Sequence, residues 1–97
     1  MRHQGATVHE LARVTELAGL PGETLARLAE RMQRQELRPG ERVDAEGRFG
    51  VVLTGMVNGA GGLLRPGQTF GGAITATTPA TVASCDRAAY EALVTRS

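Results

Sequence analysis

The chain has 97 residues, of which 41% are hydrophobic and 3% aromatic. A chain of this length forms one small domain, so we expect a single domain over residues 1–97. Its 11 basic residues, all arginine, are nearly balanced by 10 acidic residues, which leaves a formal net charge of +1. No strongly basic surface is available to hold nucleic acid or an anionic membrane, and we expect neither partner.

The chain contains few of the residue types that most often act as nucleophiles or metal ligands. Cys85 is the only cysteine, which excludes an internal disulfide and favours the reducing cytoplasm. It lies in a predicted core strand with no histidine after it, so we interpret it as an apolar filler and not as a nucleophile. His3 and His9 lack the further ligands of a zinc site. We therefore expect no enzyme activity, no metal and no cofactor, and no apolar run approaches the roughly 20 residues that span a bilayer.

Helical periodicity begins the chain and disappears from Leu37 onward, until the last helix. Apolar residues recur at helical spacing over residues 8–18, and Gly19 is expected to end that helix in a left-handed conformation. A second helix is predicted over residues 21–35 from one buried stripe. The stripe consists of Leu25, Leu28, Ala29 and Met32, at positions i, i+3, i+4 and i+7. Residues 1–36 should therefore form a helical N-terminal part.

The sequence from residue 37 onward is typical of a β structure, because glycine and proline separate short apolar segments. We predict a β-roll over residues 37–86. Residues 51–57 form a nearly continuous apolar strand that could be buried on both faces. Asn58-Gly59 is predicted to be the tight turn that follows. Further strands are expected at residues 63–64, 69–70, 74–76 and 81–85.

The chain should close with a short C-terminal helix over residues 87–97, capped by Asp86. The predicted fold class is α+β and mainly β. We expect a small jelly roll, or β-roll, with two N-terminal helices and one short C-terminal helix.

The order of these elements resembles the cyclic-nucleotide-binding domain family, the β-roll of bacterial catabolite activators and of the regulatory subunits of cyclic-nucleotide-dependent kinases. The resemblance covers nearly the whole chain. It is carried by residues 17–21 (LAGLP), 37–43 (LRPGERV), 52–57 (VLTGMV), 64–71 (LRPGQTFG) and 81–87 (TVASCDR).

One departure from the family pattern decides the functional prediction. After Phe70-Gly71 the resemblance implies a glutamate for the ribose, a short helix whose amides face the phosphate, and an arginine that pairs with it. Here Gly72 takes the place of the glutamate, and the strand at residues 74–76 leaves no room for the helix or the arginine. A buried phosphate needs charge-assisted hydrogen bonds worth about 1.5 to 3 kcal/mol each. We therefore expect a minimal member without the phosphate-binding cassette that binds no cyclic nucleotide.

Two functions of different class are compatible with this prediction. The first is a non-enzymatic regulatory or assembly module that contacts a protein partner or a second copy of itself. It predicts an exposed apolar patch or an open strand edge around residues 70–74. The alternative is a small-ligand sensor whose reduced pocket takes a cyclic nucleotide or another metabolite, through arginines and backbone amides that must converge. The candidate residues of such a remnant pocket are Arg65, Phe70, Gly71, Gly72 and Arg87.

Overall fold

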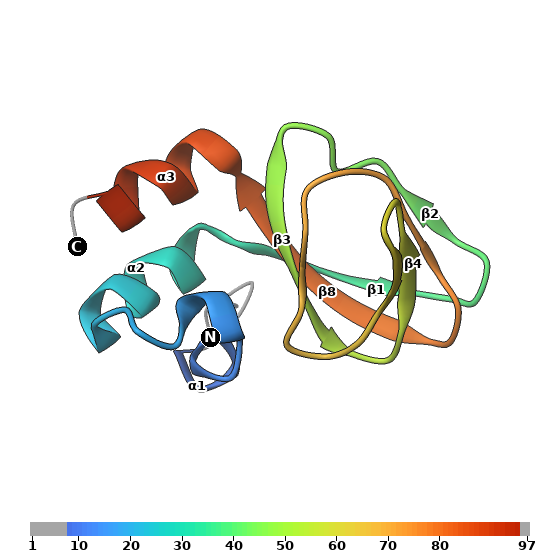
Figure 1. Ribbon diagram of the computed structural model, residues 1–97, viewed down its shortest axis with the longest axis horizontal. Helices are drawn as coiled ribbons and strands as arrows, with labels where there is room; N and C mark the ends of the chain where they lie inside the picture. The colour runs from blue at the N-terminus through green and yellow to red at the C-terminus, as the bar shows by residue number, and fades with distance from the viewer. Residues whose placement is uncertain (1–7, 96–97) are drawn as a thin grey trace.

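The computed structural model describes residues 8–95. The elements in chain order are α1 (Val8–Ala12), the 3-10 helix η1 (Thr15–Leu17), α2 (Gly22–Arg31), β1 (Gln33–Leu37), β2 (Arg42–Val43), β3 (Arg48–Thr54), β4 (Val57–Gly59), β5 (Gly62–Leu64), β6 (Thr69–Phe70), β7 (Ile74–Ala76), β8 (Ala80–Asp86) and α3 (Arg87–Thr95). Within this range the strands form two four-stranded antiparallel sheets, ordered β1-β8-β3-β6 and β2-β7-β4-β5. This arrangement confirms the predicted α+β jelly roll (Figure 1).

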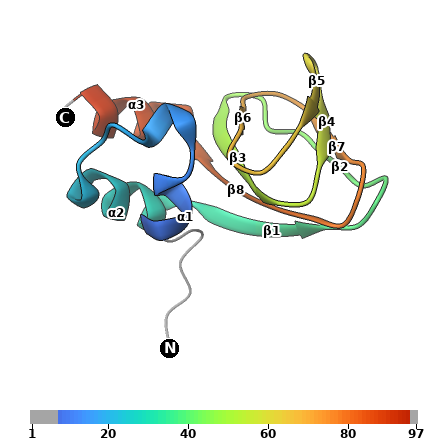
Figure 2. The ribbon, with the colours of Figure 1, turned by 60° about the horizontal axis from the view of Figure 1, so that its bottom comes forward.

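The first sheet separates two apolar clusters, because its strands alternate their side chains between the helices and the second sheet (Figures 1 and 2). We name the cluster on the helix side the helical core; it consists of Leu11, Val14, Leu17, Leu25, Leu28, Ala29, Met32, Phe49, Val51, Ala83 and Cys85. We name the cluster between the sheets the roll interior; it consists of Leu37, Ala45, Val52, Val57, Phe70, Ile74, Ala76, Ala80 and Val82.

The first helical segment is shorter and tighter than predicted. Instead of one helix over residues 8–18, α1 ends at Ala12 and a 3-10 turn follows at η1. The three buried anchors, Leu11, Val14 and Leu17, are spaced by three residues, which suits the three residues per turn of a 3-10 helix. Gly19 does not have a positive φ, so its predicted left-handed stop is wrong.

The second helix ends four residues before its predicted limit at Gln35. Its stripe is buried as expected, but Met32 is already extended, and β1 begins at Gln33. None of the residues from Met32 to Gln35 is a strong helix breaker, so the local sequence does not encode the stop. Instead, β1 pairs with β8 over five residues, and this tertiary pairing prevails over helix propensity. The helical part therefore ends before residue 33, and not at residue 36.

The predicted strand over residues 51–57 is divided at Gly55. Val51 and Val52 are buried on opposite faces, as predicted, but burial on both faces does not continue along the predicted strand, because Thr54 is exposed. Gly55, with a φ of 76°, then turns the chain from the first sheet into β4 of the second sheet. A β-carbon at Gly55 would collide with the Pro79 carbonyl oxygen, so only glycine fits this corner.

The hairpin after β4 turns two residues later than predicted. Asn58 and Gly59 belong to β4, where they pair with Leu63 and Gly62 of β5. The two-residue loop is therefore formed by residues 60–61, and not by Asn58-Gly59. Because this stretch is rich in glycine, its sequence does not specify which residues form the loop.

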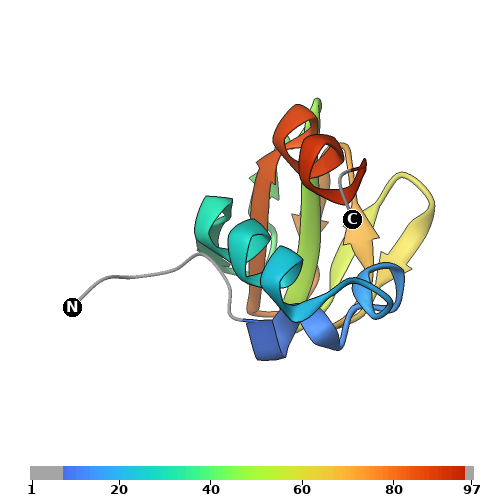
Figure 3. The ribbon, with the colours of Figure 1, turned by 90° about the vertical axis from the view of Figure 1, so that its left-hand side faces the viewer.

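The C-terminal helix follows β8 directly, as predicted, and is described as far as Thr95, because residues 96–97 lie outside the described part. Tyr90 of α3 stacks on Phe49 of β3, with ring centroids 3.7 Å apart. Figure 3 shows α2 and α3 lying across the strands. The carboxylate of Asp86, predicted to cap this helix, accepts a 3.4 Å hydrogen bond from Arg48.

Candidate functional site

The candidate site is the short connection between β6 and β7, where the family resemblance places the ligand cassette. β6 pairs with β3 in the first sheet, and β7 pairs with β2 and β4 in the second. Only residues 71–73 join them, and none of the three is helical. The connection therefore crosses from one sheet to the other by the shortest route, without a helix whose amides could face a phosphate.

Phe70 points from β6 into the roll and fills space there. Its side chain is 7% exposed and belongs to the roll interior. Phe70 pairs with Gly50 of β3, and the ring lies directly over this glycine, so that a β-carbon at Gly50 would be 2.8 Å from Cε2 of the ring. The ring therefore occupies the volume between the two sheets next to the candidate site.

The roll interior offers no polar side chain to a ligand. Among residues 8–95 no polar or charged residue is buried. Desolvating an anion in such surroundings is unfavourable, because nothing replaces the hydrogen bonds it made with water.

Arg87, one of the two candidate arginines, lies at the connection. It is exposed, at the start of α3. A β-carbon on Gly71 would be 2.5 Å from Nη2 of Arg87 and 3.5 Å from the carbonyl oxygen of Arg48. The Arg87 guanidinium therefore lies against Gly71, but it is the end of a flexible side chain, so the contact does not by itself require glycine.

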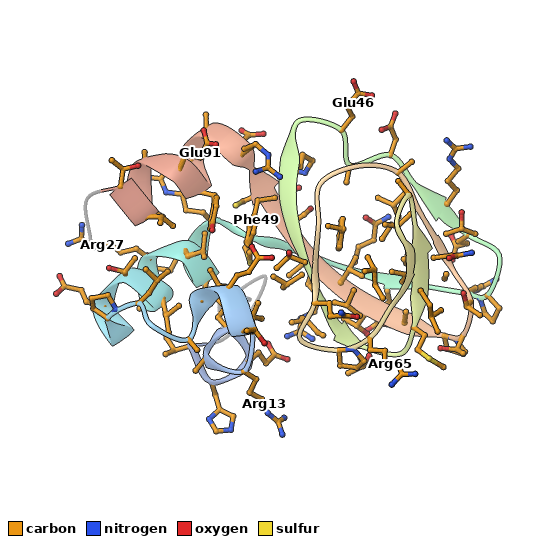
Figure 4. The ribbon with its side chains drawn as sticks, viewed as in Figure 1. Arg13, Arg27, Glu46, Phe49, Arg65 and Glu91 are labelled. Carbon is orange, nitrogen blue, oxygen red and sulfur yellow. The ribbon has the colours of Figure 1, made fainter. Side chains whose placement is uncertain are left out.

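Arg65, the other candidate, lies at the opposite end of the roll. The turn after Arg65 is bound to the far end of β3, since the Gly67 amide donates to the Val52 carbonyl at 2.9 Å. Gly71, by contrast, lies beside Arg48 at the start of β3. Figure 4 shows Arg65 at the lower edge of the roll and Glu46, just before β3, at the upper edge. The structure thus brings Phe70, Gly71 and Arg87 together, but not Arg65.

The expected exposed apolar patch around residues 70–74 is absent from this part of the structure. Phe70 is 7% exposed and Ile74 1% exposed, because both side chains point into the roll interior. β6 does lie at the edge of its sheet, although it is only two residues long. Its Thr69 hydroxyl donates a 2.6 Å hydrogen bond to Glu16, which ties this edge to η1.

Sequence reasoning missed Arg48, whose side chain spans three strands. From β3 it donates to Ser84 Oγ and to the Ser84 carbonyl of β8, both at 3.2 Å, and to Gln33 of β1 at 3.3 Å. Its ion pair with Asp86 measures 3.4 Å, but the Asp86 side chain is 79% exposed, so this pair adds little stability. Only the cross-strand register places these partners together, and no local motif signals it.

A hollow of about 400 Å³ lies beside α1, at the end of β3 away from the β6–β7 connection. It is lined by Glu10, Arg13, Val52, Leu53, Thr54, Pro66 and Gly67. Neither Phe70 nor Arg87 contributes to it. This hollow therefore does not enlarge the candidate site.

No metal centre is formed within the described residues. Among residues 8–95 no group of three or more histidine, cysteine, aspartate or glutamate side chains is placed to hold a metal ion. His9 is exposed on α1, and His3 lies outside the described range. None of the helices in residues 8–95 is long and apolar enough to cross a membrane.

Two weakly acidic side chains predict how stability depends on pH. Burial raises the pKa of the Cys85 thiol, and burial followed by the charge of Glu16 raises the pKa of Tyr90. Each group keeps its proton to higher pH in the folded chain than in the unfolded chain. The stability that they contribute is therefore complete below the ordinary thiol pKa of about 8.5 and is lost as pH rises beyond it.

We expect the Cys85→Ala variant to lose less stability than the parent between about pH 8 and pH 10, because it lacks the thiol whose pKa is shifted. Urea unfolding at a series of pH values measures this difference. Parallel pH profiles for the two proteins would contradict it.

No family model matches the sequence, and the search of curated proteins finds no match. Solved structures do match. The regulatory domain of Toxoplasma gondii PKA with cAMP superposes with a TM-score of 0.77 at 17% identity, over 90% of this chain and 43% of that chain. The regulatory subunit of a cAMP-independent protein kinase A from Trypanosoma cruzi, bound to guanosine, gives 0.74 at 22% identity, over 91% of this chain and 40% of that chain.

A third structure matches at nearly full length. A cyclic nucleotide-binding-like protein from Brucella abortus gives a TM-score of 0.66 at 19% identity, over 91% of this chain and 97% of that chain. By contrast, the chain spans less than half of the two kinase regulatory chains. At these identities the likeness defines the fold, and the fold is that of a cyclic-nucleotide-binding domain.

Proposed function

We propose that this chain is a non-enzymatic regulatory or assembly module that has the fold of a cyclic-nucleotide-binding domain, binds no cyclic nucleotide and acts through contacts with protein chains. The observation that carries the proposal is the filled roll interior, with Phe70 over Gly50 and no buried polar residue within residues 8–95. A cyclic nucleotide entering this space would displace apolar side chains and lose its hydration without compensation. The single cysteine, buried and free, is consistent with a cytoplasmic protein.

Thermal unfolding in the presence of cyclic AMP or cyclic GMP tests the proposal. A ligand present at about 100 times its Kd adds about 2.7 kcal/mol of stability. In a domain of this size, this shift would raise the Tm by roughly 10 °C or more. We expect no change in Tm with either nucleotide at millimolar concentration. A Tm that rises with nucleotide concentration would contradict the proposal.

The ligand-sensor alternative is supported by one observation, the Arg87 guanidinium against the backbone of Gly71. An exposed guanidinium beside the glycines of the β6–β7 connection is able to bind a small anionic metabolite at the surface. The two arginines provide a matched test, because Arg65 lies at the other end of β3. A sensor of this kind would lose its ligand-induced Tm shift in Arg87→Ala and keep it in Arg65→Ala. The guanosine in the Trypanosoma cruzi neighbour makes guanosine a probe to include beside the cyclic nucleotides.

A further inference from the structure

We propose that the free edge of β1 pairs with the same edge of a second copy, antiparallel and centred on Gln35, so that two first sheets become one continuous sheet. This inference rests on the proposed function and names the partner as another copy of this chain. It concerns a surface remote from the β6–β7 connection.

The outer edge of β1 has no pairing partner in the part of the chain that the structure describes. Within residues 8–95 β1 is the outer strand of its sheet and pairs only with β8. Figure 2 shows it along the lower side of the roll. Its first four residues, 33–36, are all exposed, and only Leu37 is buried. The outer N–H and C=O groups of such a strand are ready to pair with another strand.

The charges on β1 are self-complementary. Arg34 and Glu36 lie on the same face of the strand, two residues apart. In an antiparallel pair centred on Gln35, each Arg34 stands directly opposite the Glu36 of the other copy. Opposite charges in directly opposing positions stabilise a sheet, and like charges destabilise it.

The same pattern selects this register over its neighbours. A pair centred on Arg34 would place two Arg34 side chains opposite each other. A pair centred on Glu36 would oppose two Glu36 side chains and also set Arg34 against Arg38. Charges on edge strands usually prevent pairing. Here their opposite signs and symmetric placement permit pairing in one register.

The side chains needed for this contact are accessible. Glu36 makes no ion pair with any of residues 8–95. Arg34 already binds Glu10 at 2.7 Å, but its side chain is 37% exposed. A guanidinium has five N–H donors, so Arg34 can keep Glu10 and also face Glu36 of the second copy.

Sedimentation of the full chain from micromolar to millimolar concentration tests the pairing. We expect a reversible dimer in the parent, with amide hydrogens of residues 33–37 that exchange more slowly as the dimer forms. Glu36→Arg sets each Arg34 against a second arginine at two symmetric positions and should weaken the dimer about tenfold or more. The charge-swapped double variant, Arg34→Glu with Glu36→Arg, restores opposite pairs and should recover the dimer. Thermal unfolding of each variant checks that it is folded.

Glu91→Arg is the matched control, since it makes the same change of charge on α3, away from β1 (Figure 4). It should leave the dimer unchanged. A chain that stays monomeric at all concentrations would overturn the pairing. A dimer that Glu36→Arg does not weaken, or that the charge-swapped double variant does not recover, would also overturn the pairing. Nucleotide binding is measured separately, by the Tm. A monomer whose Tm does not change with nucleotides would overturn the pairing but leave the proposed function standing. A dimer that binds cyclic AMP would overturn the proposed function but leave the pairing standing.

Discussion

Replacing Phe70 by alanine should lower the free energy of unfolding by about 3 to 5 kcal/mol, as expected for a buried aromatic side chain. The ring is 7% exposed and packs over Gly50 between two sheets. The sheets are held by their own hydrogen bonds and cannot collapse freely into the vacated space, so a cavity remains. Stabilities of domains are about 5 to 15 kcal/mol, so this loss is a large part of the total. Urea unfolding of parent and variant measures it.

Leu63→Ala is the control for this prediction. Leu63 lies on β5 and is 47% exposed, so its truncation should change stability by only about 0.5 kcal/mol. Equal losses in Phe70→Ala and Leu63→Ala would show that Phe70 does not fill the roll. The cavity in Phe70→Ala would also be lined by apolar groups, so we expect this variant to remain without affinity for cyclic nucleotides.

Gly55→Ala should be nearly as damaging, with an expected loss of about 2 to 6 kcal/mol from backbone strain and overpacking together. Gly55 has a φ of 76°, which a residue with a β-carbon rarely adopts. The new methyl group would also meet the Pro79 carbonyl oxygen and lie 2.7 Å from the Ala80 Cα. Both obstacles are backbone atoms, one directly before β8 and one at its first residue, so they cannot move aside without disturbing the first sheet.

Gly47→Ala separates the two causes. Gly47 has a φ of 77°, nearly the same as Gly55, but a β-carbon there would meet nothing within 4 Å. This variant should lose only the strain component, about 1 to 2 kcal/mol. Thermal and urea unfolding of both variants give the comparison. If Gly47→Ala and Gly55→Ala lose the same stability, the collision at the corner between the sheets is not real.

Much of the fold could be predicted from the sequence, because the apolar spacing reports burial directly. The stripe on α2 and the residues Val51 and Val52 of β3 are buried as expected. The boundaries were less accurate. The end of α2 depends on pairing between β1 and β8, which are more than forty residues apart. The hairpin loop depends on which glycines form the turn, and several positions allow it.

The candidate site was predictable in part. Its position between β6 and β7, and the short connection there, follow from residues adjacent in the sequence. The direction of the Phe70 side chain cannot be predicted from neighbouring residues, because it depends on the register with Gly50 of β3. The separation of Arg65 from Arg87 likewise depends on which ends of β3 their neighbours contact. Cross-strand register, which no local motif carries, decides both.

The proposed function requires that this β-roll, although it has the fold of a cyclic-nucleotide-binding domain, has no place for the nucleotide. An amide-resolved NMR titration with cyclic AMP and cyclic GMP at millimolar concentration tests it most directly, because the same spectrum reports folding. We predict a dispersed spectrum in which no amide shifts saturably. Saturable shifts clustered on residues 67–74 and Arg87 would contradict the proposed function.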